Sequence, residues 1–493
     1  TGVVTVALSD QLNTLDTLTS TAASGSGAER VRTLIFNTLV RKDAQFNYTG
    51  ELAKDITFSD DGLAVKMTLR DSVKFHNGKP FTSSDVKYTF DQLFASNSFK
   101  AKAFSERVGD QTEQYIKSMD FPDDKSVIFN LNKPSYRHKL LANLVAIPII
   151  PEGSVSEQAT KPTGTGPYKF ISYDSGQNIV EFEAFDDYWE GAPKIKRLRV
   201  KVLRDASSLQ AELQNGAVDI APLPTSLTPD NINQFEKGGQ VNVYKFDGSN
   251  IQYIGLNTTS PPLDDKRIRQ AIAYAIDRNK IIQELLSNQA KIAYSILPPQ
   301  SWAYSEGTKY EFDPEKAKKL LQEAGYKNQP IKFKYQAGNS AYNLYAQAIQ
   351  SSLSNIGLNV QIETIDTSTL QQQLEQGQFQ MNTGIWIGGN QDPIFLRDLF
   401  STDYIPGKNA RCCNRGRYSN PQVDLLLTNA INELDPQKAK EFYIKAWDLI
   451  SQDVPLIPLW YPSNIVITSK RIGNIQMNAS GDWSFIKNAT LAQ

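Results

Sequence analysis

Two histidines are all that this sequence of 493 residues offers for imidazole catalysis or for histidine-ligated metal binding. His76 lies in residues 75–78 (Phe-His-Asn-Gly), a pattern typical of a turn after an alternating strand, and His138 lies between two basic residues. No zinc-site spacing is present, and no Gly-x-Ser-x-Gly elbow supplies a serine nucleophile. We therefore predict structural positions for both histidines, no catalytic residue and no bound metal.

Phosphate-binding and carboxylate motifs are equally weak. Residues 164–167 (Gly-Thr-Gly-Pro) are rich in glycine, but proline has no amide hydrogen to donate to a phosphate. The adjacent carboxylates at 60–61, 123–124 and 186–187 stand beside turn residues, where aspartate is favoured for local backbone bonding. These patterns favour a protein that is not an enzyme and that uses no cofactor.

The only cysteines, Cys412 and Cys413, are neighbours in the chain. A bond between them would close a strained small ring, so two free thiols and a vicinal disulfide both stay open. No third cysteine exists to link distant segments, and the pair therefore says little about the redox compartment.

Composition and charge indicate a folded protein with more than one domain. The chain has 52 basic and 53 acidic residues, a net charge of −1, so nucleic acid is not an expected partner. Its length exceeds what one hydrophobic core usually organises. The longest apolar run, residues 140–150, is too short to cross a bilayer. Because the sequence starts at Thr1 without a basic and apolar leader, it is either cytosolic or a mature form.

Hydrophobic periodicity predicts strands and helices that alternate. Up to about residue 253 the chain is rich in strands, with a helix capped by Ser83 or Ser84 and another that begins at Asp205. Later helices begin at the pair Asp264-Asp265, at Asp313 and at Asp435, and strands at 331–335, 360–365, 455–460 and 465–468 come between or after them. The pattern indicates an α/β protein.

Several segments, taken in order, resemble the family 5 solute-binding proteins, which are the dipeptide-, oligopeptide- and nickel-binding proteins of bacterial importers. The densest segment, residues 69–86, is similar to a strand, turn and capped helix of that family. The further matching segments are residues 164–168, 188–193, 213–220, 267–271, 276–278 and 316–326.

This resemblance implies a two-lobe periplasmic-binding-protein-like clamp with an extra subdomain in the N-terminal lobe. Residues 1–253 and 466–493 would form the N-terminal lobe, with the subdomain at about 45–163, and residues 254–465 would form the other lobe. Ligand would be enclosed in the cleft when the lobes close at a hinge. The resemblance also implies a monomer that serves the transmembrane subunits of an ABC importer and is periplasmic or lipid-anchored outside the cytoplasmic membrane.

The segment at 386–393 (Trp-Ile-Gly-Gly-Asn-Gln-Asp-Pro) resembles a binding-site segment of the family. In peptide binders of the family, an aspartate three positions after the tryptophan pairs with the α-ammonium of the peptide; here that position is Gly389. An ammonium enclosed without a counter-charge costs several kcal/mol. We expect Trp386 and Gly388 to line the cleft.

Other residues are candidates for ligand contacts. Asn390 and Gln391 offer neutral acceptors, and Asp392 either reaches the ligand or holds the turn before Pro393. The remaining candidates are Asn13 in a cleft-lining loop, Tyr253 where the chain crosses between lobes, and Arg411, which with Arg415 and Arg417 flanks the cysteines and suits a carboxylate or phosphate.

The ligand class stays open at the sequence level. A short peptide or peptide-like solute is the expectation from the family, whereas Gly389 favours an oligosaccharide or another uncharged or anionic solute. A nickel site and a hydrolase are both disfavoured by the scarcity of histidine and of nucleophile motifs.

Overall fold

The computed structural model describes residues 2–20, 26–407 and 413–492. Contacts divide the chain into two compact units. Unit 1 comprises Thr1–Glu106, Glu113–Phe246 and Asn464–Gln493, and unit 2 comprises Arg107–Thr112 and Asp247–Ser463. The units divide after residues 246 and 463. The lobe boundaries expected from the sequence were residues 253 and 465.

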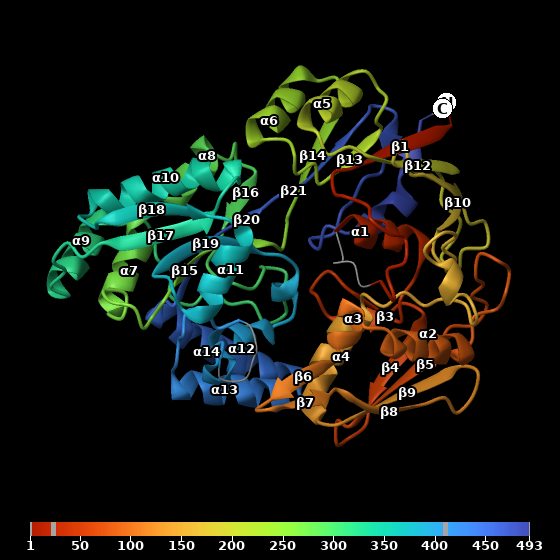
Figure 1. Ribbon diagram of the computed structural model, residues 1–493, viewed down its shortest axis with the longest axis horizontal. Coiled ribbons are helices and arrows are strands. Elements are labelled where there is room, and N and C mark those ends of the chain that lie inside the picture. Colours follow the sequence, from red (N-terminus) through yellow and green to blue (C-terminus); the bar gives the residue numbers. More distant parts are fainter. Residues whose placement is uncertain (1, 21–25, 408–412, 493) are drawn as a thin grey trace. The chain divides into compact units, whose positions relative to one another are not determined.

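A seven-stranded sheet organises unit 1, in the order β10-β11-β12-β1-β13-β21-β14 (Figure 1). Strand β1 (Val3–Leu8) runs parallel to β12 (Arg197–Val202) and β13 (Ile220–Pro222). Strand β21 (Asn464–Thr468) lies between β13 and β14 (Asn242–Phe246), antiparallel to both. The strand predicted at 465–468 therefore belongs to the sheet of the N-terminal unit.

A buried ion pair ties this late segment to the first strand. The Asp219 carboxylate accepts hydrogen bonds from Nε (2.7 Å) and Nη2 (2.8 Å) of Arg471 and from the backbone amide of Thr5 (3.0 Å). The Asp219 side chain is 3% exposed, so its charge depends on these partners for solvation.

A second, four-stranded sheet of unit 1 lies within the predicted subdomain range, in the order β4-β5-β9-β8. Its strands are β4 (Ala53–Phe58), β5 (Ala64–Leu69), β8 (Ile116–Asp120) and β9 (Ser126–Leu131). Helix α2 (Ser83–Ala95) is capped by Thr82, not by Ser83 or Ser84 as predicted. Thr82 forms a capping box with Asp85, which satisfies amides at both ends of the motif.

His76 joins two of the segments that resemble the family. Its Nε2 bonds the carbonyl oxygen of Gly166 (2.9 Å), so Nε2 carries the hydrogen, and Nδ1 accepts from the Gly164 amide (3.3 Å). Burial lowers the pKa of His76 to about 4, which keeps the ring neutral. The contacts give His76 the structural position predicted from its turn.

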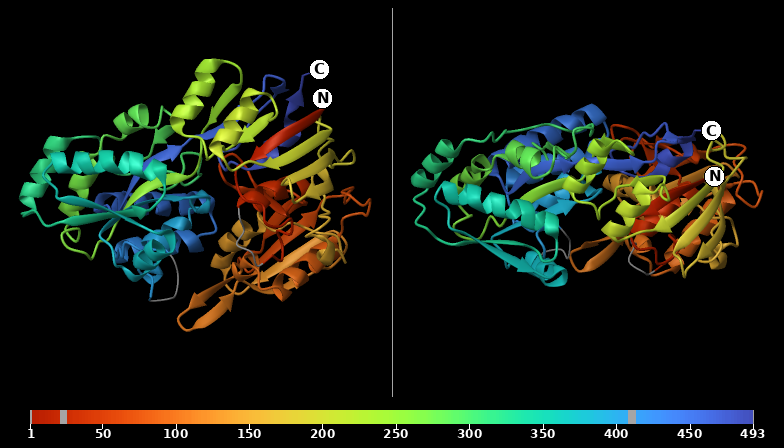
Figure 2. Two further views of the ribbon diagram at one scale, coloured as in Figure 1. Left: turned by 45° about the horizontal axis from the view of Figure 1, so that its top comes forward. Right: turned by 90° about the horizontal axis from the view of Figure 1, so that it is seen from above.

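Unit 2 is built on a six-stranded sheet in the order β16-β20-β15-β19-β17-β18 (Figure 1). Figure 2 draws the same unit from two further directions. The strands are β15 (Ile251–Leu256), β16 (Ala290–Ile292), β17 (Ile331–Gln336), β18 (Val360–Ile365), β19 (Met381–Trp386) and β20 (Leu456–Pro462). Strand β17 is parallel to β18 and β19, whereas β15 is antiparallel to β19 and β20. The unit is a mixed α/β structure, as predicted.

Helices pack against this sheet in two separate cores. Ile254 and Leu256 of β15 belong to one core with α7 (Lys266–Ala275), α9 (Pro314–Glu323) and α10 (Ser340–Asn355). Ile251 lies an odd number of residues from Ile254, so its side chain points to the other face of β15. It belongs to the other core with α12 (Phe395–Phe400), α13 (Pro421–Asn432) and α14 (Pro436–Asp453). Because side chains alternate along a strand, β15 supplies one residue set to each core.

Candidate functional site

The pairing of β15 with β19 brings Tyr253 and Trp386 together. Ile251 lies opposite Trp386, and Tyr253 lies opposite Gly384. Residues that face each other in an antiparallel pair share one face of the sheet. Tyr253 and Trp386 therefore project from the same face, the one that carries Ile251.

Their rings stack with centroids 5.8 Å apart and planes inclined by 13°. The close approach needs a glycine between them, because a Cβ at position 384 would lie 3.0 Å from the Tyr253 hydroxyl. Phe395 of α12 meets the Trp386 ring edge-on at 5.2 Å. The three aromatic side chains form a rigid corner on this face.

Arg415 completes the corner from the segment after the cysteines. Its guanidinium lies 5.3 Å from the centre of the Trp386 ring. Nε (3.1 Å) and Nη2 (3.0 Å) both donate to one carboxylate oxygen of Glu375, near the end of α11 (Thr367–Gln376). Burial raises the pKa of Tyr253, because the buried ring resists ionisation, and the nearby positive charge of Arg415 opposes this rise.

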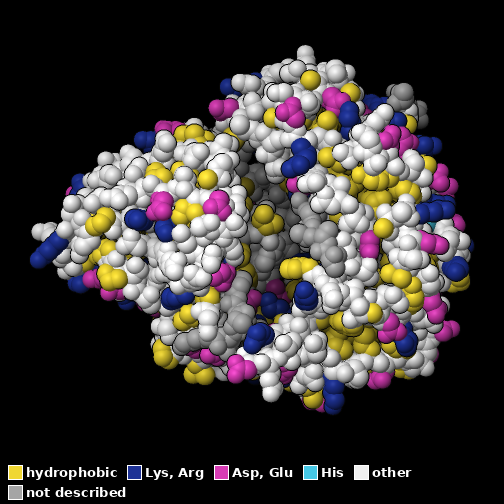
Figure 3. Space-filling model, in the orientation of Figure 1, with side chains coloured by type: hydrophobic (Ala, Val, Ile, Leu, Met, Phe, Trp, Pro, Cys, Tyr) yellow, Lys and Arg dark blue, Asp and Glu magenta, His cyan; other side chains and the backbone are white. Residues whose placement is uncertain are grey.

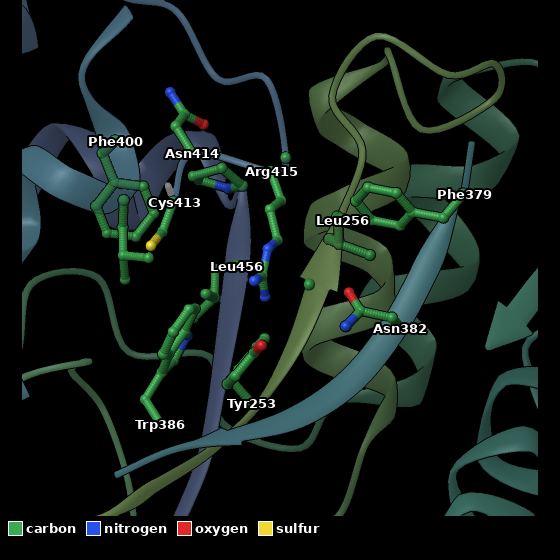
Figure 4. Close-up of a pocket in the computed structure, with 14 residues that line it drawn as sticks. Tyr253, Leu256, Phe379, Asn382, Trp386, Phe400, Cys413, Asn414, Arg415 and Leu456 are labelled. Carbon is green, nitrogen blue, oxygen red and sulfur yellow. The ribbon is translucent and has the colours of Figure 1, made fainter. Parts of the chain in front are cut away.

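These side chains enclose a cavity of about 30 Å³, which is the room needed by one water-sized group (Figure 4). Fourteen residues of the described ranges line it, and Arg415 is the only charged one among these fourteen. Figure 4 shows Tyr253, Trp386 and Arg415 converging on it from three different segments. We call it the Arg415 cavity.

The segment after Trp386 divides into an exposed part and a buried part. Ile387 is 73% exposed, Gly388 has a φ of +77°, and Gly389 is exposed. A Cβ at position 389 would lie 3.0 Å from the ring of Phe395, tighter than most such contacts. A side chain at Gly389 would therefore require this ring to move.

The three polar residues that follow are turned into the unit. Asn390 is 0% exposed, and its amide donates to the carbonyl oxygens of Ser249 (2.7 Å) and Ile296 (2.9 Å). Gln391 donates to the Ser249 hydroxyl (3.2 Å), and Asp392 accepts from the backbone amide two residues ahead (2.9 Å). Of the two roles expected for Asp392, this hydrogen bond corresponds to the one that holds the turn before Pro393.

The other predicted residues fall elsewhere. Asn13 is exposed on a loop of unit 1. Arg411 and Cys412 lie outside the described residues. Cys413 is buried and disulfide-bonded, and it lines the Arg415 cavity. Arg417 donates to the carbonyl oxygens of Glu375 and Arg415, so it closes the end of α11.

Asn382 and Glu375 were not predicted from sequence. Asn382 lines the cavity together with Tyr253. A signal was present, because Asn382, Gly384 and Trp386 alternate along β19 and share one face of the sheet. Glu375 carries no such signal, since it lies on a helix and meets the corner through its ion pair with Arg415.

Within the described ranges, no group of three or more histidine, cysteine or acidic side chains could hold a metal ion. No helix in the described part of the chain is long and apolar enough to cross a membrane. On the face drawn in Figure 3, basic and acidic side chains are interspersed, in line with the balanced composition.

Known proteins resemble this chain over nearly its whole length. Heme-binding protein A of Haemophilus influenzae is 28% identical over 473 residues, which cover 89% of this chain and 83% of that protein. Oligopeptide-binding protein AppA of Bacillus subtilis is 26% identical over 489 residues, 94% and 87% of the two chains. The solved structure of HbpA2 from Haemophilus parasuis matches with a TM-score of 0.84, 26% identity and complete coverage of both chains.

The fold is thus that of the substrate-binding proteins that work with ABC transporters, which are not enzymes. Residues 47–407 match the family described as bacterial extracellular solute-binding proteins, family 5 Middle. The chain belongs to family 5 of the bacterial extracellular solute-binding proteins. The predicted family and the two-lobe α/β fold class are confirmed.

Proposed function

We propose that this chain captures a short peptide or peptide-like solute for an ABC importer, and that it holds this solute without a carboxylate partner for an α-ammonium group. Capture would occur by closure of the two units around the solute, so that affinity equals the closed-state contacts less the cost of closing. The protein would act as a monomer, periplasmic or lipid-anchored outside the cytoplasmic membrane.

The relatives support the peptide part of the proposal. AppA of Bacillus subtilis is named as an oligopeptide-binding protein, and its solved structure in complex with a nonapeptide matches this chain with a TM-score of 0.74 at 25% identity. The family also includes a protein named for heme binding, so peptide binding is not implied by family alone.

The environment of Gly389 supports the proposal that the solute is held without a carboxylate partner for an α-ammonium group. This position has no side chain, and Phe395 occupies the space that a Cβ would approach. Asp392, the next carboxylate along the segment, is buried and accepts a backbone hydrogen bond within its own turn. Recognition of a free α-ammonium through this segment is therefore disfavoured.

A thermal-shift screen tests the proposal with three ligand sets: di- to pentapeptides, the same peptides N-acetylated, and oligosaccharides. Ligand at a hundred times Kd adds about 2.7 kcal/mol to the stability of the folded state. We expect N-acetylated peptides to stabilise the protein as much as free-amine peptides do. Stabilisation by free-amine peptides alone contradicts the proposal that the solute needs no carboxylate partner at Gly389. Stabilisation by oligosaccharides alone contradicts the proposal that the ligand is a peptide or peptide-like solute.

A further inference from the structure

The Arg415 cavity is lined by a residue whose hydrogen-bond donor lacks an acceptor. The indole nitrogen of Trp386 is buried and has no hydrogen-bond partner in the structure as described. A buried donor without an acceptor is uncommon in folded proteins and suggests a missing partner. A group bound in the cavity beside Trp386 would supply that acceptor.

Arg415 adds further donors at the same place. A guanidinium has five N–H groups. Nε and Nη2 each donate one of them to Glu375, and the guanidinium also lines the cavity. Burial raises the pKa of Tyr253, so this neighbour in the lining stays neutral and adds no charge to the cavity.

The charge of the cavity has one sign. Among the described residues that line it, Arg415 is the only charged one, and Glu375 is not part of that lining. Glu375 is 33% exposed and binds through one oxygen, so solvent screens part of its counter-charge. An ammonium placed here would meet a cation, whereas an anionic oxygen would meet a cation and several N–H groups.

The size of the cavity limits what can enter. About 30 Å³ holds one water-sized group and not a whole side chain. One oxygen of an acidic group fits this volume, with the rest of the solute outside.

We infer that the Arg415 cavity receives one oxygen of a carboxylate on the solute, so that the protein selects peptide-like solutes by an acidic end and not by an amino end. The inference rests on the proposed function and specifies the chemistry of its ligand. Arg415 and Trp386 are the residues that determine this specificity.

Four pools of random tripeptides test this selection. The pools carry a free or acetylated amino end combined with a free or amidated carboxyl end, and equilibrium dialysis with mass spectrometry measures retention by the wild-type protein. We expect both pools with a free carboxylate to be retained about tenfold better than their amides, which is the effect of one or two charge-assisted hydrogen bonds.

The possible results separate the two proposals. Equal retention of acids and amides, with no effect of acetylation, overturns the carboxylate inference and leaves the proposed function standing. Retention that depends on a free amino end overturns the proposed function. No retention of any pool overturns both.

Variants assign the effect to residues. Arg415→Gln should abolish the preference for acids, and Trp386→Phe, which keeps the ring and removes the N–H group, should weaken it. Arg397→Gln is the matched control, because Arg397 is also 15% exposed, pairs with a carboxylate and lies over a tyrosine ring, but does not line the cavity. Circular dichroism checks that each variant folds, and an acid preference that survives Arg415→Gln in a folded protein overturns the inference.

Discussion

Replacement of Gly389 by aspartate would put a carboxylate where peptide binders of the family pair with an α-ammonium. A charge-assisted hydrogen bond of this kind contributes about 1.5–3 kcal/mol, or about ten- to a hundredfold in affinity. The structure opposes it, because the new Cβ would stand 3.0 Å from the Phe395 ring. Phe395 in turn packs on Trp386, so displacing its ring costs about 1–3 kcal/mol. We therefore expect the single variant to gain little.

The double variant Gly389→Asp with Phe395→Leu removes that conflict, since leucine lacks the ring atom that the new Cβ would approach. We expect it to bind free-amine tripeptides about tenfold more tightly than N-acetylated ones, by isothermal titration calorimetry. Phe395→Leu alone is the matched control and, like the wild type, should bind free-amine and N-acetylated tripeptides equally well.

Two different results would refute this reasoning. A tenfold preference of the wild-type protein for free amines would mean that another group already pairs with the ammonium. A double variant that folds, binds both peptide sets and still shows no preference would mean that position 389 does not face the amino end of the solute.

Three further predictions concern charge and stability. Glu375→Gln removes the counter-charge of Arg415 and should raise the affinity for acid-ended tripeptides about two- to fivefold in calorimetry; unchanged or lower affinity argues against the carboxylate site. His76 has a folded-state pKa of about 4 against an ordinary value of 6.5, so its contribution to the free energy of unfolding is fully present above pH 6.5 and is lost as the pH falls toward 4, by at most about 3 kcal/mol. In urea unfolding across this pH range, the free energy of unfolding of His76→Gln should depend less steeply on pH than that of the wild type. An equal pH dependence of the two proteins excludes the effect. Arg471→Gln leaves the Asp219 carboxylate buried without its cation and should cost about 3 kcal/mol in denaturant unfolding, whereas a cost under about 1 kcal/mol would show that the remaining hydrogen bonds suffice.

Local chemistry made much of the fold predictable. Asp205, Asp313 and Asp435 each cap the helix predicted to begin there, because an aspartate side chain accepts an amide hydrogen that the first turn leaves unpaired. The helix after Thr82 was placed too late by one or two residues, although the spacing of Thr82 and Asp85 is that of a capping box. Patterns within one element were therefore sufficient where the stabilising contact is local.

The aromatic corner could be named only in part, because its contacts are distant in sequence. Trp386 followed from the family segment, but its stacking on Tyr253 depends on the register of two strands 130 residues apart. Asn390 was proposed as a neutral acceptor for the ligand, and the structure adds that its amide nitrogen ties the turn to Ser249 and Ile296. Such a turn orients its polar groups through long-range partners that no local pattern specifies.

Two separate features of this corner act in the same electrostatic direction. The loss of a carboxylate at Gly389 alone would leave a neutral surface, which could still accept an amino end at a modest cost. The cation of Arg415, which has no charged neighbour among the described lining residues, adds a repulsion for an ammonium and an attraction for an acid. Glu375 moderates that attraction without entering the cavity. Because Gly389 and Arg415 lie on different segments, the double-variant experiment addresses the first feature and the Glu375 experiment addresses the second.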